Sequence, residues 1–101
     1  MLKTSINIPM NEISAFCKKW KIAEFALFGS VLRDDFQPDS DIDVLVTFAP
    51  DAHISLFDLA VMEDELQIIF KRKVDLVEKA GLRNPFRRRE ILSNMEIIYA
   101  S

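Results

Sequence analysis

Two apolar segments are joined by the stretch 29-GSVLRDDFQPDSDIDVLV-46. The first segment, residues 22–28, is expected to be a short buried strand that ends at Gly29. Residues 30–34 could form one helical turn, and residues 37–40 carry strong turn chemistry. The valine-rich run over 42–48 is typical of a strand that is covered on both faces of a sheet. The stretch therefore predicts two strands joined by a turn and a loop.

Outside this stretch, apolar spacing predicts a helix over residues 10–20 and another from Ser55 to about Phe70. The second helix begins with a capping box, in which Ser55 is followed three residues later by Asp58. In both helices apolar side chains recur every three or four residues, which aligns them on one face. The side chains expected to face the core are Ile13, Phe16, Cys17 and Trp20 in the first helix, and Leu56, Leu59, Met62, Leu66 and Ile69 in the second.

Two more strands and a third helix complete the prediction. Apolar runs over 73–78 and 95–99 are expected to be strands, the last one at a sheet edge. Asn84-Pro85 offers an N-cap and a first-turn proline for a helix that runs to about residue 93. The order helix, strand, strand, helix, strand, helix, strand predicts an α/β fold with a small mixed β-sheet and helices packed against it.

Length and composition limit the classes of function. The 101 residues suit one compact domain over 1–101, and the net charge of −3 argues against binding of extended nucleic acid. No apolar run approaches the roughly 20 residues that span a bilayer, and the start is too polar for a signal peptide. Cys17 is the only cysteine, so an internal disulfide is impossible. We therefore expect a cytoplasmic protein.

Three carboxylates could share one face of the predicted sheet. Asp41 and Asp43 project the same way because strand side chains alternate, and Asp75 lies inside another apolar run. Magnesium prefers oxygen ligands, so the set could hold one or two Mg²⁺ ions about 4 Å apart. The alternatives are an ordinary solvated acidic pair at the strand start and an edge position at which Asp75 faces water.

The pair Gly29-Ser30 could supply a phosphate-binding turn. A glycine lets the backbone approach a ligand, and a short helix start offers free N–H groups to an anion. Arg33 could reach a phosphate, or it could pair with a nearby aspartate. The run Arg87-Arg88-Arg89 could be a solvated helix face, a partner surface or a contact with a triphosphate. Together these features favour phosphoryl or nucleotidyl transfer from a nucleoside triphosphate.

The combined motif resembles the DNA polymerase β-like nucleotidyltransferase superfamily, and the whole chain resembles its minimal nucleotidyltransferase domains. Gly-Ser, ten residues, Asp-x-Asp and a later aspartate are all present. The resemblance implies that Gly29 and Ser30 bind the triphosphate of ATP, while Asp41, Asp43 and Asp75 bind Mg²⁺ and carry catalysis. Asp34 departs from the pattern, because many members carry glycine after the arginine.

Small members of this family resemble antitoxins whose partners are helical HEPN-domain toxins, usually ribonucleases. The resemblance implies transfer of AMP from ATP to a tyrosine hydroxyl of the toxin. Two alternatives stay open: a non-catalytic antitoxin that neutralises its partner by binding, and transfer to a small molecule or an RNA end. The chain could act within a homo- or hetero-oligomer.

Overall fold

Four strands form one mixed sheet in the computed structural model, which describes residues 8–32 and 40–101. The sheet order is β3-β2-β1-β4; β1 is antiparallel to β2 and β4, whereas β2 and β3 are parallel. The predicted α/β fold is confirmed. As expected, β4 lies at a sheet edge, and its bounds are one residue later than predicted. The strands are β1 (Ile22–Phe28), β2 (Ile42–Phe48), β3 (Val74–Glu78) and β4 (Glu96–Ala100).

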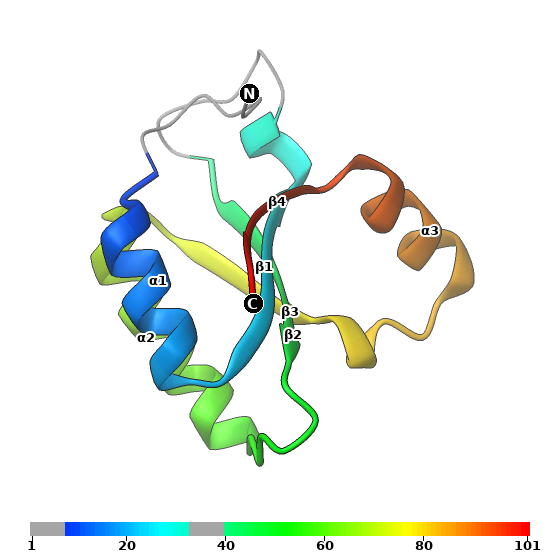
Figure 1. The fold of residues 1–101 in the computed structure, drawn as a ribbon. Coiled ribbons are helices and arrows are strands. Elements are labelled where there is room, and N and C mark those ends of the chain that lie inside the picture. The colour runs from blue at the N-terminus through cyan, green and yellow to red at the C-terminus, as the bar shows by residue number, and fades with distance from the viewer. Residues whose placement is uncertain (1–7, 33–39) are drawn as a thin grey trace.

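Helices cover the two faces of this sheet. The helices α1 (Met10–Lys19) and α2 (Leu56–Phe70) lie on one side, and α3 (Pro85–Asn94) lies on the other (Figure 1). The predicted caps are present: Ser55 and Asp58 form the capping box, and the Asn84 side chain accepts bonds from the first turn of α3. Two short 3-10 turns, η1 (Gly29–Leu32) and η2 (Lys79–Gly81), follow β1 and β3.

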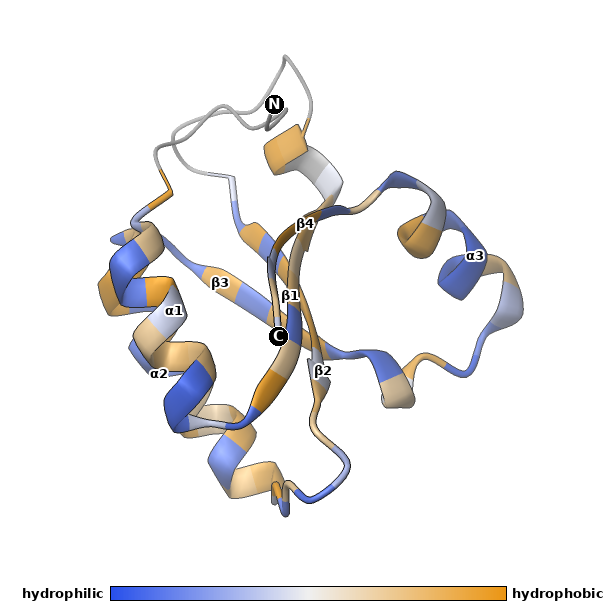
Figure 2. Cartoon of the chain, viewed as in Figure 1, coloured by the Kyte–Doolittle hydropathy of each residue, from blue (hydrophilic) through white to orange (hydrophobic). Residues whose placement is uncertain are grey.

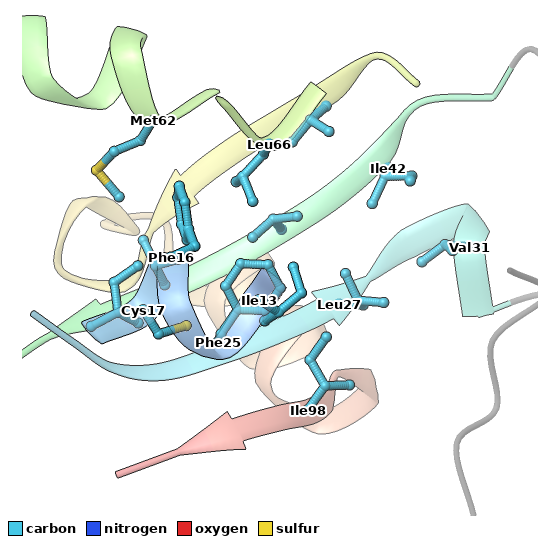
Figure 3. Packing of buried hydrophobic residues seen from close by; sticks show 14 residues of the cluster. Ile13, Phe16, Cys17, Phe25, Leu27, Val31, Ile42, Met62, Leu66 and Ile98 are labelled. Carbon is cyan, nitrogen blue, oxygen red and sulfur yellow. The ribbon is translucent and has the colours of Figure 1, made fainter. Parts of the chain in front are cut away.

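The buried side chains form two clusters of unequal size. The larger cluster, between the sheet and the helices α1 and α2, has fourteen buried residues (Figure 3). In it, the rings of Phe16 and Phe25 make an edge-to-face contact with their centroids 6.2 Å apart. Hydropathy colouring shows the apolar β1 and β2 between the two layers and a largely hydrophilic α3 (Figure 2). The smaller cluster, on the α3 side, consists of Ala26, Phe28, Leu45, Leu82 and Ile91.

One predicted core position is wrong. Leu56 is 85% exposed, whereas Met62 and Leu66 are buried, and Leu59 and Ile69 pack against the core as expected. The 3.6-residue repeat turns Leu56 roughly 100° away from the mean direction of Met62 and Leu66. The three-residue interval to Leu59 therefore did not bring Leu56 onto the core face. No helix within the described ranges is long and apolar enough to cross a membrane.

Candidate active site

A tight turn at the end of β1 brings backbone and carboxylate together. Gly29 has a φ angle of +75°, a backbone conformation that residues with a Cβ rarely adopt. A Cβ on Gly29 would also collide with Oδ2 of Asp43, the neighbour of Phe28 on β2. Glycine is therefore required here on two grounds, and it allows the Asp43 carboxylate to lie directly against the turn.

Two of the predicted carboxylates lie side by side on adjacent strands. Asp43 of β2 and Asp75 of β3 are partners in the parallel register. Ile42 and Val74, the residues before them, point into the larger cluster, so both aspartates project to the α3 side of the sheet. Asp43 is half-buried and Asp75 is exposed. The third apolar run therefore lies beside the Asp-x-Asp strand, the arrangement in which Asp75 could join the other carboxylates.

The third carboxylate is less tightly placed. Asp41 is exposed and directly precedes β2, so strand alternation does not fix its direction. Within residues 8–32 and 40–101, no three His, Cys, Asp or Glu side chains gather closely enough to hold a metal ion. Magnesium in nucleotide sites is held through one or two carboxylates plus substrate phosphates. The all-oxygen pair Asp43 and Asp75 fits that mode of binding.

A cavity of about 690 Å³ opens between the Gly29 turn and α3. Its volume lies within the range of small-molecule sites. Phe28, Leu32 and Ile91 supply apolar wall, and Arg87 is the one cation among the described residues that line it. The other lining residues are Gly29, Glu90, Ser93, Asn94, Met95 and Glu96. The cavity therefore combines apolar surface with a few polar groups on the same side of the sheet as Asp43 and Asp75.

The three consecutive arginines of α3 have three different surroundings. Arg87 lines the cavity. Arg88 donates hydrogen bonds to the carbonyl oxygens of Lys79 and Leu82, at 3.2 and 3.5 Å, and thereby ties α3 to η2. Arg89 is exposed and lies outside the cavity lining. The three arginines therefore do not share one environment.

The structure places some of the predicted site residues together and leaves others outside its described part. The structure brings Gly29, Asp43 and Asp75 together, with Asp41 at the entry to β2. Ser30 follows Gly29 in η1, but its side chain lies outside the described part, as do Arg33 and Asp34. Apart from Arg87, which was considered as a possible triphosphate contact, sequence reasoning missed the cavity wall on α3, although the polar spacing of Arg87, Glu90 and Asn94 marks one helix face.

Comparisons with known proteins agree with this geometry. Residues 10–98 match the family described as a nucleotidyltransferase domain. A Methanocaldococcus jannaschii protein named "Putative protein adenylyltransferase" is 40% identical over 76 residues, which cover 73% of this chain and 74% of the relative.

Solved structures share the fold. One, a toxin–antitoxin crystal structure with AMP-PNP, has a TM-score of 0.76 at 18% identity and covers 93% of this chain and 75% of that one. Another, a tri-AMPylated HEPN toxin of Shewanella oneidensis in complex with an MNT antitoxin, has a TM-score of 0.64 at 20% identity and covers 91% and 70%. These matches confirm the resemblance that the sequence motif suggested: this chain belongs to the nucleotidyltransferase domain family.

Proposed function

We propose that this chain is an antitoxin that transfers AMP from ATP to a tyrosine hydroxyl of a HEPN-domain toxin and so silences it. The observation that carries the proposal is the group formed by Gly29, Asp43 and Asp75 on the α3 side of the sheet, where the cavity opens. The names of the similar proteins, a protein adenylyltransferase and a HEPN toxin complex, support the same donor and the same kind of acceptor.

In the proposed reaction, the acceptor oxygen attacks the α-phosphorus of ATP. A phosphorus–oxygen bond forms to the acceptor, the bond to the β-phosphate oxygen breaks, and pyrophosphate leaves. The hydroxyl proton passes to solvent or to the Asp75 carboxylate. In this reaction the backbone N–H groups of the Gly29-Ser30 turn would bind the triphosphate, with Arg33 as a further contact.

Asp43 and Asp75, with Asp41, would hold Mg²⁺ in this site. When bound, the ion neutralises the triphosphate charge and makes the hydroxyl more acidic. The cavity would receive the nucleoside, because its apolar walls and polar groups suit a base and a ribose. An acceptor presented by a partner protein would then approach from outside the cavity.

The proposal can be tested by co-expression with a HEPN-domain protein encoded next to this chain. Intact mass spectrometry of that protein should show increments of one AMP. The increments should vanish with Asp43→Asn plus Asp75→Asn and persist with Asp64→Asn, a matched change of an exposed acid on α2.

Two other results would contradict the proposal. A stable complex and neutralised toxicity without any mass change would identify a non-catalytic antitoxin. Labelling of RNA or of a small molecule from radioactive ATP, with the partner protein unlabelled, would identify a different acceptor.

A further inference from the structure

Two polar side chains of α2 reach the outer edge of β3. The Glu63 carboxylate accepts a hydrogen bond from the Leu76 N–H, and the Gln67 amide oxygen accepts one from the Val74 N–H, both at 3.1 Å. Because β3 is the outermost strand and pairs only with β2, its outward amides have no strand partner. Glu63 and Gln67 therefore take the place of a neighbouring strand.

The spacing of helix and strand makes this double contact possible. Val74 and Leu76 are two residues apart in an extended strand, about 6.6 Å. Glu63 and Gln67 are four residues apart on one flank of a helix, about 6 Å. The two intervals match, so both bonds can form together in the observed register of β3 along α2. A shift of β3 by one residue would break both bonds, so the pair fixes the position of the strand along its length.

Asp75 lies between the two capped amides. Its backbone is held on the outer side by Gln67 and Glu63 and on the inner side by β2, where its partner is Asp43. An edge strand of five residues would otherwise fray, since it is paired on one side only. The proposed site needs the Asp75 carboxylate to stay beside the Asp43 carboxylate. The hydrogen bonds from Glu63 and Gln67 hold the backbone on either side of Asp75.

We propose that Glu63 and Gln67 are positioning residues of the active site, which hold Asp75 beside Asp43 so that both carboxylates bind the same nucleotide-bound divalent cation. This inference rests on the proposed function. The competing explanation is that the two caps only protect an open sheet edge from pairing with another strand. The explanations differ in what they expect of the folded protein's metal affinity.

The test measures binding of Mn²⁺, as a paramagnetic substitute for Mg²⁺, by electron paramagnetic resonance in the presence of AMP-PNP. Glu63→Ala plus Gln67→Ala should weaken Mn²⁺ binding by about tenfold, as expected for two lost hydrogen bonds. Amide hydrogen exchange should show that protection at Val74 and Leu76 is lost. Each single alanine variant should lose part of the affinity, which keeps the test valid if the double variant does not fold.

The matched control exchanges the two caps. Glu63→Gln plus Gln67→Glu keeps both acceptor oxygens and the net charge, so it should restore Mn²⁺ binding. Asp64→Ala, next to Glu63 but without a bond to β3, should leave binding unchanged.

Equal Mn²⁺ affinity in the double alanine variant, or equal loss in the exchanged variant, would overturn the inference alone. No binding of Mn²⁺ with AMP-PNP to the unmodified protein would overturn the inference and the proposed function together.

Discussion

The two faces of the sheet are covered to different extents. On the α1 and α2 side, fourteen buried residues form a closed cluster, whereas the α3 side has five buried residues beside a cavity of about 690 Å³. Gly29, Asp43 and Asp75 are found on the less covered side. The proposed function explains this difference: one face mainly supplies stability, while the other leaves room for the nucleotide at the expense of packing. Each prediction below tests that division.

The largest effect is expected from truncating the closed face. Phe25→Ala should lower the free energy of unfolding by about 3–5 kcal/mol, because Phe25 is fully buried against Phe16. Ile91→Ala, on the cavity side, should cost about 2 kcal/mol. Chemical denaturation measures both. AMP-PNP binding, corrected for the folded fraction, should weaken only with Ile91→Ala; weakening by Phe25→Ala would break the division.

A second prediction separates function from stability at the turn. Gly29→Ala should cost about 1–2 kcal/mol through the positive φ and should lower AMP transfer about 100-fold, because the new Cβ displaces the Asp43 carboxylate. Gly81→Ala is the matched control, since a Cβ there meets no atom within 4 Å. Thermal melts and AMP transfer assays give both quantities. Retention of full activity by Gly29→Ala would contradict the assignment of the turn.

The third prediction concerns the attachment of α3 to the open face. Arg88→Ala should destabilise by about 1 kcal/mol, because it removes the bonds to the Lys79 and Leu82 carbonyl oxygens. Arg89→Ala, whose side chain is exposed, should change the free energy of unfolding by less than about 0.5 kcal/mol. Urea denaturation can resolve the two. Equal effects would mean that the neighbouring arginines are interchangeable after all.

The smallest effect belongs to the link between α1 and α2 on the closed face. Burial raises the pKa of Glu65, but the bonds from Lys19 and the Trp20 ring N–H outweigh it and leave that pKa below its ordinary value of 4.5. The charged form is therefore favoured in the folded state. Its contribution is present above about pH 4.5 and is lost as the pH falls through the lowered value.

Glu65→Gln should consequently cost about 0.5 kcal/mol at pH 7, because it loses the ion pair but keeps an oxygen for Trp20. The difference from the unmodified protein should shrink steadily below pH 4.5. Denaturation curves at several pH values measure it. A difference that stays constant down to pH 2 would show that the ion pair does not contribute.

Local signals predicted the closed face and the turn well. Capping residues and strand alternation depend on near neighbours, so β1, β2 and the Ser55 cap could be predicted, and Asp75 followed from a charge inside an apolar run. The cavity wall on α3 could not, because the direction of that helix depends on packing between distant segments. The roles of Glu63 and Gln67 were hidden for the same reason, and Leu56 shows how apolar spacing alone misleads near a helix end.

The pairing of the first strand with the last has a consequence for synthesis on the ribosome. β1 bonds to β4, so its second edge stays open until residues 96–100 have been made. By then α1, β2, α2 and β3 have been synthesised, and with them the whole closed cluster except Ile98, together with both carboxylates of the Asp43–Asp75 pair. A nascent chain interrupted before α3 would therefore carry both carboxylates but lack the α3 wall of the cavity. The cavity can therefore form only after the carboxylate pair has been made.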